Sequence, residues 1–443
     1  MASNSTKKRK KNSAAARARK RRQERRMALG FTAFLLVSLG AFASIALLNR
    51  NDDATEAPRV EVLAPVADAS AQVLSITTAA PTTATAARAL SEANATVVPT
   101  TAPTLSPTTE PTDEPTAEPT RAPVTIKLTA VGDCTLGGDY NTGYYKSFAG
   151  YYDSYGSDYF FEKVRDLFAS DDLTVVNLEG PLTTSKDKRS GRKFNFKGAP
   201  EYVDILRNSS VEIANVANNH SLDFGESGFE ETCRVLTDAN IGASGFSQIY
   251  YTDVKGVTVC SIGLTQWAYS QEQMVKAVQM ARPNCDLLIV SIHWGEEYKH
   301  EQNAQQISMG HAMIDAGADV VIGNHSHVYG AIEYYHGKYI VYSLGNFCFG
   351  GNRNPSDKDT AIFQEVFQID ADGRVADLGI DIIPARLSGS DKKNDFQPCV
   401  IEDDARARKL LNKILNVSSL HKEDGAVWMA GSRAAALLNG AES

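Results

Sequence analysis

Hydrophobic runs rich in β-branched residues alternate along the second half of the chain with segments of helical periodicity. The strand-like runs fall at 124–131, 173–176, 211–217, 257–263, 286–292 and 320–322. The helix-like segments between them fall at 161–170, 201–207, 226–239, 270–281 and 303–316. Further strand patterns follow at 331–335, 339–343, 360–370 and 375–384. Alternation that gives way to a strand-rich end predicts an α/β sandwich rather than a doubly wound sheet.

Polar residues with metal-ligating side chains follow several of these predicted strands. They are Asp133, Asn177, Glu179, Asn219, His220, His293, His325 and His327. Because ligands of open α/β sheets bind beyond the carboxyl ends of strands, we expect these side chains to converge. Residues two apart in extended backbone point to one side, so both imidazoles of the His-x-His pair can face one point. That pair alone is also typical of a polar surface loop, but the other strand ends favour a metal site.

The mixture of carboxylate, amide and imidazole groups indicates which metals to expect. It suits one or two divalent ions such as Mn, Fe or Zn better than a structural cysteine-type zinc site. The sequence contains no CxxC motif.

The strand-end motifs together resemble those of the CapA (PgsA) family of poly-γ-glutamate capsule biosynthesis proteins. The resemblance runs from about Thr125 to Pro384. It rests on Gly132-Asp133, Asn177-Leu178-Glu179-Gly180, residues 217–225 (ANNHSLDFG), His293-Trp294-Gly295, residues 323–327 (GNHSH) and residues 342–347 (YSLGNF). The resemblance implies a four-layer α/β/β/α sandwich of the calcineurin-like metallophosphoesterase type with two metal ions.

The resemblance also implies roles for individual residues. Asp133 would be the terminal carboxylate of the first metal and Glu179 the bridging carboxylate, with His327 returning to the first metal. Asn219, His293 and His325 would hold the second metal. His220 would act as the general acid near the leaving group, and Asp133 is its companion in the catalytic set.

Two positions depart from the phosphoesterase pattern. Thr135 stands where the Asp-x-His motif of that fold has histidine, and Asn177-Leu178-Glu179 replaces the usual aspartate pair. A hydroxyl is a poor metal ligand, so the first metal is expected to be weak, absent or completed by water.

The amino-terminal part of the chain predicts membrane anchoring. Residues 1–26 contain twelve Lys or Arg and one Glu, whereas the whole chain has a net charge of −8. Residues 27–48 are uncharged and long enough to span a bilayer as a helix. The positive-inside bias predicts a single-pass protein of the cell membrane with a cytoplasmic basic tail and an extracellular main domain. A cleaved signal peptide is the alternative, with Ala41-Phe42-Ala43 as the cleavage pattern.

The rest of the chain divides by composition. Residues 49–123 are rich in Ala, Thr and Pro and predict a disordered linker, with a proline at every fourth position from Pro99 to Pro123. Residues 124–400 form the predicted folded domain, and residues 401–443 a helical or disordered tail. The six cysteines lie in the predicted exported part, where disulfides are permitted. Their spacing favours no pairing, and Cys260 and Cys348 have the surroundings of core residues.

Several further residues have two interpretations. A basic loop, defined as Lys186, Lys188, Arg189, Arg192, Lys193 and Lys197, either attracts a polyanion or is a solvated loop. Asp223, Glu296 and Glu297 are candidate partners that orient metal-bound histidines. Trp294 and the tyrosines at 140–159 either line a substrate groove or pack in the core.

Three functions follow from these features. The first is an anchored capsule protein for synthesis, export or wall attachment of poly-γ-glutamate or a related anionic polymer. Its expected partners are the membrane, the polymer or a phosphorylated wall polymer, and membrane-bound capsule synthesis proteins, but not nucleic acid. The second is a metal-dependent phosphoesterase or other hydrolase of an unrelated substrate. The third is a non-catalytic polymer-binding scaffold.

Overall fold

The computed structural model describes residues 59–62, 122–246, 248–420 and 426–440. The predicted basic tail 1–26, the predicted anchor 27–48 and most of the predicted linker lie outside these residues. Among the described residues, no helix is both long enough and apolar enough to cross a membrane.

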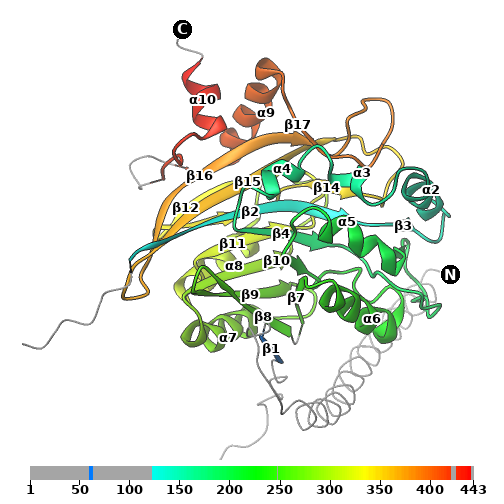
Figure 1. The fold of residues 1–443 in the computed structure, drawn as a ribbon, viewed down its shortest axis with the longest axis horizontal. Helices are drawn as coiled ribbons and strands as arrows, with labels where there is room; N and C mark the ends of the chain where they lie inside the picture. Colours follow the sequence, from blue (N-terminus) through cyan, green and yellow to red (C-terminus); the bar gives the residue numbers. More distant parts are fainter. Residues whose placement is uncertain (1–58, 63–121, 247, 421–425, 441–443) are drawn as a thin grey trace, which may run out of the picture. The chain divides into compact units, whose positions relative to one another are not determined.

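Two large sheets form the described folded part (Figure 1). Sheet A has the order β1-β8-β9-β10-β11-β13-β12. Its strands are β1 (Arg59–Val62), β8 (Gln248–Val254), β9 (Val257–Thr265), β10 (Leu287–His293), β11 (Val320–Asn324), β12 (Ile332–Tyr335) and β13 (Lys338–Val341). The parallel core of this sheet, β9-β10-β11, is where the sequence alternates between strand and helix patterns.

Sheet B has the order β17-β16-β15-β2-β4-β6-β7, and β14 pairs with β2. Its strands are β2 (Val124–Thr135), β4 (Leu173–Leu178), β6 (Ile213–Asn215), β7 (Gly242–Ser244), β14 (Asn346–Phe349), β15 (Asp359–Ile369), β16 (Val375–Arg386) and β17 (Cys399–Val400). The short strands β3 (Gly138–Asp139) and β5 (Phe196–Lys197) pair only with each other. The mixed α/β class predicted from the sequence is confirmed.

Three hydrophobic clusters show how the layers pack. One cluster joins the two sheets face to face and includes Leu128 of β2, Ile289 of β10 and Phe363 of β15, all fully buried. A second covers the outer face of sheet A with α7 (Gln271–Ala281) and α8 (Ala304–Asp315). The third covers the outer face of sheet B. Its helices are α2 (Tyr145–Tyr155), α3 (Asp158–Phe161), α4 (Arg165–Phe168), α5 (Val203–Arg207) and α6 (Gly225–Asp238). Each sheet is therefore covered on both faces, which explains its long hydrophobic strands.

The tyrosine-rich segment, for which no helix was predicted, contains helix α2. Phe148 on this helix is fully buried and stacks on Phe160 of α3 with ring centroids 4.5 Å apart. Tyr151 and Tyr152 pack against the same cluster, so these rings serve the core. The single helix predicted at 161–170 is instead split into α3 and α4.

The carboxyl-terminal part contains two helices, α9 (Asp404–Val417) and α10 (Arg433–Asn439), beside β16 (Figure 1). Asp381 of β16 caps α10, because its carboxylate accepts hydrogen bonds from the backbone N–H groups of Arg433 and Ala434 at 2.8 and 2.9 Å. Two short additional 3-10 turns span Pro200–Tyr202 and Arg282–Asn284. Within the predicted linker, β1 pairs antiparallel with β8 at the edge of sheet A.

Glu365 is a buried carboxyl group without a hydrogen-bond partner among the described residues. It lies in β15 on the same face as Phe363 and Phe367, both of the core between the sheets. Burial, and after it the nearby Asp377 carboxylate, raise the pKa of Glu365 well above its ordinary value. The folded state therefore holds a proton that the unfolded chain releases at lower pH.

This proton predicts how stability depends on pH. Between the ordinary pKa of Glu and the raised one, native stability falls as pH rises, by up to about 1.4 kcal/mol per pH unit. Glu365→Gln removes the titrating group, so its melting temperature relative to the native protein should rise from about pH 5 to about pH 8. Glu301→Gln at an exposed position is the control and should show no such trend. A constant difference between Glu365→Gln and the native protein across this range would contradict the assignment.

Candidate metal centre

The register of sheet B places three polar residues in one row. Asp133 of β2 lies beside Asn177 of β4, which lies beside Asn215 of β6. Hydrogen bonds connect them, since Asn215 Nδ2 donates to Asn177 Oδ1 at 2.8 Å and Asn177 Nδ2 donates to Asp133 Oδ1 at 2.7 Å. All three are buried, so the row fixes the Asp133 carboxylate in place.

The backbone of β2 also packs closely against the turn at Gly345, and this contact helps to hold Asp133 in place. The backbone N–H of Asp133 donates to Gly345 O at 2.8 Å. A Cβ atom on Gly132 would lie 1.9 Å from that same oxygen, so only glycine fits before Asp133.

Sheet A supplies the histidines. His293 ends β10 and pairs in register with Asn324, the last residue of β11. His325 and His327 follow directly and have φ angles of 103° and 59°. Such conformations cost about 1–3 kcal/mol each in non-glycine residues, and they concentrate at functional sites. The turn therefore bends the chain so that both imidazoles face the Asp133 row.

One group of ligands contains Asp133, Glu179 and His327. One potential ligand atom from each lies within 4.8 Å of the others, and all three residues are buried. His327 Nδ1 lies 3.3 Å from Asp133 Oδ2, and His327 Nε2 lies 3.9 Å from Glu179 Oε1. Both of these carboxylate oxygens are buried without a hydrogen-bond partner among the described residues. Unpartnered buried carboxylate oxygens fit a cation.

A second group contains Asn219, His293 and His325. His293 Nε2 lies 3.0 Å from Asn219 Oδ1 and 3.1 Å from His325 Nδ1. The same nitrogen lies 3.7 Å from Glu179 Oε1, so Glu179 stands between the two groups. The residues present fit two neighbouring divalent ions with Glu179 shared between them.

Protonation within the two groups differs. Burial lowers the pKa of His293 well below its ordinary value, and burial followed by the charge of His327 lowers the pKa of His325 to about 4. These two imidazoles are neutral at pH 7 and can coordinate a metal. Burial would also lower the pKa of His327, but Glu179 and Asp133 raise it to about 10. Burial raises the pKa of Glu179 to about 7. Metal binding at the first group therefore releases a proton.

The two departures from the phosphoesterase pattern have structural roles. The Thr135 hydroxyl donates to Glu179 Oε2 at 3.0 Å and leaves Oε1 facing the histidines. Asn177 donates to Asp133 and also lies 3.2 Å from His293 Nδ1, so it links the two groups. Neither residue adds a ligand, but each orients one.

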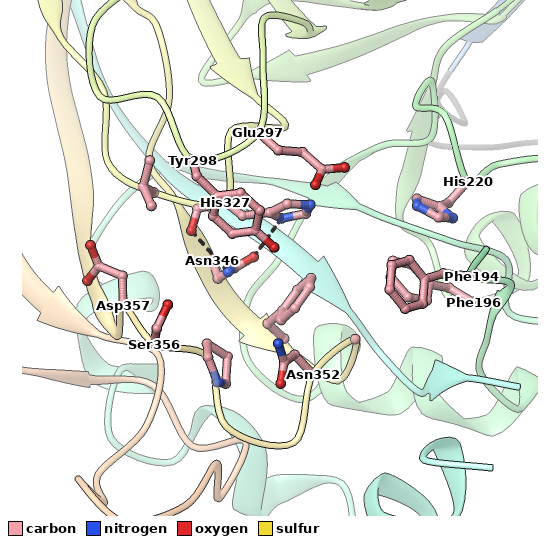
Figure 2. Close-up of a pocket in the computed structure, with 14 residues that line it drawn as sticks. Phe194, Phe196, His220, Glu297, Tyr298, His327, Asn346, Asn352, Ser356 and Asp357 are labelled. Carbon is pink, nitrogen blue, oxygen red and sulfur yellow. Dashed lines mark hydrogen bonds between the residues drawn. The ribbon is translucent and has the colours of Figure 1, made fainter. Parts of the chain in front are cut away.

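His220 lies beside both groups and lines the pocket shown in Figure 2. Its Nδ1 lies 2.6 Å from Asp223 Oδ2, and its ring stacks on Phe196 with centroids 4.0 Å apart. Asp223 in turn accepts a hydrogen bond from the backbone N–H of Phe196 at 2.7 Å and lies near Arg192. The His220 ring is thus fixed in one orientation at the wall of the pocket.

Other sequence predictions differ in outcome. Asp223 contacts His220, which is not one of the predicted metal ligands, rather than a metal-bound histidine. Glu296 and Glu297 are exposed, and no hydrogen bond from either to a histidine of the centre occurs among the described residues, so their predicted orienting role is wrong. Trp294 is fully buried and stacks on Tyr342, which assigns it to packing. All six cysteines are free thiols, and Cys260 and Cys348 are fully buried.

Three residues of the centre were not recognised from the sequence. Asn215 begins the hydrogen-bonded row, and Asn346 Oδ1 lies 2.9 Å from His327 Nδ1. Trp267 is half exposed and contacts His325 edge-on at 4.5 Å between centroids. Trp267 follows the end of β9, and Asn215 ends β6, so both carry the strand-end signal that identified the other residues.

A family model described as "Bacterial capsule synthesis protein PGA_cap" matches residues 127–351. The chain belongs to this family. The match contains every residue of the two ligand groups as well as His220. The CapA resemblance seen in the strand-end motifs is confirmed.

Named relatives agree with this family. The chain is 30% identical over 274 residues to "PGA biosynthesis protein CapA" of Bacillus subtilis (strain 168), covering 56% of this chain and 71% of the relative. It is 28% identical to "Capsule biosynthesis protein CapA" of Bacillus anthracis, covering 54% of this chain and 64% of the relative. A "probable polyglutamine synthesis accessory protein" of Mycobacterium tuberculosis is 28% identical over 209 residues, with 40% and 55% covered.

Solved structures align with the chain more remotely. The protein TT1561 of Thermus thermophilus aligns at a TM-score of 0.32 and 10% identity, covering 57% of this chain and 98% of that chain. A purple acid phosphatase from yellow lupin aligns at a TM-score of 0.28 and 11% identity, covering 59% and 54%. Likenesses at this level carry no functional inference.

The Thr135 hydroxyl predicts a measurable effect on metal affinity. Thr135→Val keeps the shape but removes the donor, so Glu179 is free to turn away from the ligand position. We expect metal dissociation constants to rise about tenfold or more, in line with the loss of other residues that orient ligands. Thr135→Ser retains a hydroxyl and should restore most of the affinity. Calorimetric titration with Mn²⁺ checks this, and equal affinities for all three proteins would refute the role of Thr135.

Proposed function

We propose that this chain is a membrane-anchored, extracytoplasmic capsule protein with a metal-dependent hydrolytic centre of the metallophosphoesterase type. Its polymer is poly-γ-glutamate or a related anionic surface polymer. The membrane anchor rests on residues 1–48, where a basic tail precedes an uncharged run. The link to the polymer rests on the names of the Bacillus relatives.

One observation carries the hydrolytic part of this proposal. Asp133, Glu179 and His327 converge within 4.8 Å, and buried carboxylate oxygens in this group have no hydrogen-bond partner among the described residues. Core packing does not explain such a group, because each unpartnered buried charge destabilises the fold. Two sheets with helices on both outer faces and ligands at the strand ends also agree with the metallophosphoesterase architecture.

Metal binding and proton transfer belong to different residues in this proposal. Asp133, Glu179 and His327 hold one divalent ion, and Asn219, His293 and His325 hold the other with Glu179. Bound divalent ions supply Lewis-acid activation of water and of the attacked group. His220, held by Asp223 at 2.6 Å, delivers a proton to the leaving group. The Asp223 carboxylate holds the ring in one orientation for this role.

Polymer binding without turnover is a second candidate function. The basic loop lies next to the centre, where its Arg192 guanidinium donates to the backbone oxygen of Asn219. Lys186, Lys188 and Lys193 in this loop are exposed. Exposed cations beside the centre attract polyanions, and this attraction weakens with salt.

Metal analysis of the full chain separates these candidates. After loading with Mn²⁺ and removal of free ions, we expect two ions per chain. The double variant His325→Ala/His327→Ala should hold none. His336→Ala, which changes an exposed histidine away from the centre, is the matched control and should hold two. A native chain that binds no ion but retains poly-γ-glutamate would overturn the hydrolase proposal in favour of the binding scaffold.

His220 should affect turnover without affecting metal content. His220→Ala removes the proton donor but no metal ligand, so we expect hydrolysis of an alkyl phosphodiester, whose alkoxide leaving group needs a proton, to fall about 10²–10⁴-fold. The bound Mn²⁺ should stay at the native level. If His220→Ala hydrolyses the phosphodiester at the native rate, His220 is not the general acid.

A further inference from the structure

A pocket opens beside the candidate centre, next to His327 and Asn346 (Figure 2). Its volume is about 140 Å³. A pocket of this size has room for several waters or for a short chain of a few heavy atoms. It therefore suits a small group attached to whatever the centre binds.

The chemistry of the pocket wall is acidic and aromatic. Two carboxylates, Glu297 and Asp357, line it together with the rings of Phe194, Phe196, Tyr298 and Phe349. No Lys or Arg is among the described residues that line it. The basic loop borders the same pocket, because Phe194 and Phe196 lie between its Lys193 and Lys197, and Lys193 Nζ lies 4.8 Å from the centroid of the Phe194 ring.

The two carboxylates differ in their charged neighbours. No ion pair to Glu297 occurs among the described residues, and its side chain is exposed. Asp357 accepts a backbone hydrogen bond at 2.9 Å, its Oδ2 lies 3.9 Å from His300 Nε2, and the charge of Lys413 also interacts with it. Lys358 is adjacent in sequence but directs its Nζ to Asn354 Oδ1 at 2.6 Å. Glu297 is therefore the less compensated of the two carboxylates.

Tyr298 presents an aromatic surface at this wall. It is 64% exposed, so its ring does not serve the core. Its φ of 63° is unusual for a residue other than glycine, and its backbone N–H donates to Ser326 O at 2.7 Å. This bond ties Tyr298 to the turn that carries His325 and His327. Aromatic faces combined with carboxylates are the chemistry that recognises an ammonium group.

Two histidines, His327 and His220, line the same pocket, and Glu297 lies on their side of it, apart from Asp357, in Figure 2. The centre beyond His327 takes divalent cations under the proposed function. A ligand that satisfies both the centre and the wall carries an oxyanion toward the centre and a positive charge toward Glu297 and Asp357. A second carboxylate beside Glu297 and Asp357 would be repelled.

We propose that the pocket binds a short aminoalkyl group of a ligand whose oxyanion lies at the metal centre. The inference deepens the proposed function and rests on it only for the placement of the oxyanion. Poly-γ-glutamate carboxylates then approach from the basic loop, while the amine-bearing part occupies the pocket. Glu297 and Asp357 determine this specificity.

Three phosphomonoesters of similar length test the inference. Aminoethyl phosphate, propyl phosphate and carboxyethyl phosphate differ chiefly in the charge of the group that would enter the pocket. We expect the metal-loaded full chain to bind them in that order of decreasing affinity, with about a tenfold step between neighbours. Isothermal titration calorimetry measures the three dissociation constants. Equal affinities, or tightest binding of carboxyethyl phosphate, would overturn the inference.

Variants of the two pocket carboxylates test whether the pocket causes the preference for the aminoethyl ester. Glu297→Gln and Asp357→Asn should each reduce the preference for the aminoethyl ester severalfold, and together they should remove it. Glu296→Gln changes an exposed neighbour that does not line the pocket, so it should keep the full preference. If the double variant keeps the native preference, the pocket carboxylates do not select the ligand.

A second series separates this inference from the proposed function. Propylammonium, propanol and propanoate carry no phosphate, and ligand-observed NMR can follow their binding to the full chain after metal has been removed with a chelator. Preference for propylammonium in a chain that fails to bind metal would leave the pocket inference standing and remove only the hydrolytic proposal. Metal binding and phosphate binding without any amine preference would remove only the pocket inference.

Discussion

A row of hydrogen bonds across three parallel strands holds the candidate centre together. Asn215 donates to Asn177, and Asn177 donates to Asp133, along the carboxyl ends of β6, β4 and β2. The row is buried, so loss of any member leaves an unpaired polar group that costs about 1–3 kcal/mol. It also gives Asp133 a fixed orientation, with one oxygen bonded to Asn177 and the other facing His327. The turn of sheet A that carries His325 and His327 packs against this fixed carboxylate. This contact places the remaining ligands around it.

Charges of both signs surround the centre. The basic loop borders His220 through Arg192, which lies near Asp223, and the pocket beside His327 carries Glu297 and Asp357. The two surfaces meet at Phe194 and Phe196, which lie within the basic loop and also line the pocket. A ligand at the centre therefore meets cations of the basic loop as well as carboxylates and exposed aromatic rings. Family membership alone does not contain this information, because it depends on the residues of the surrounding loops.

The sequence predicted the strand ends well because hydrophobic periodicity and polar termination are local signals. Asp133, Glu179, His293, His325 and His327 were each found in this way, and the structure brings them together. The partners that orient them were harder to predict. Asn215 contributes through register, and Thr135 through a hydroxyl that points at Glu179, and neither fact is visible before strands are paired.

The predicted orienting role of Glu296 and Glu297 was wrong because it did not take the turn at Gly295 into account. Both follow His293 closely in sequence, which suggested contact with the metal-bound histidines. Gly295 has a φ of 86°, and the chain turns there, so both carboxylates leave the strand direction and become exposed. Helix α2 was missed for a different reason, because its glycine- and tyrosine-rich sequence has low helix propensity and its packing on α3 decides its structure.

The most direct test of the central claim is anomalous X-ray diffraction from crystals of this protein grown with Mn²⁺. The account predicts two anomalous peaks at the carboxyl ends of the strands. One should contact Asp133, Glu179 and His327, and the other should contact Asn219, His293 and His325. Crystals that contain Mn²⁺ but show no peak at these residues would contradict the account.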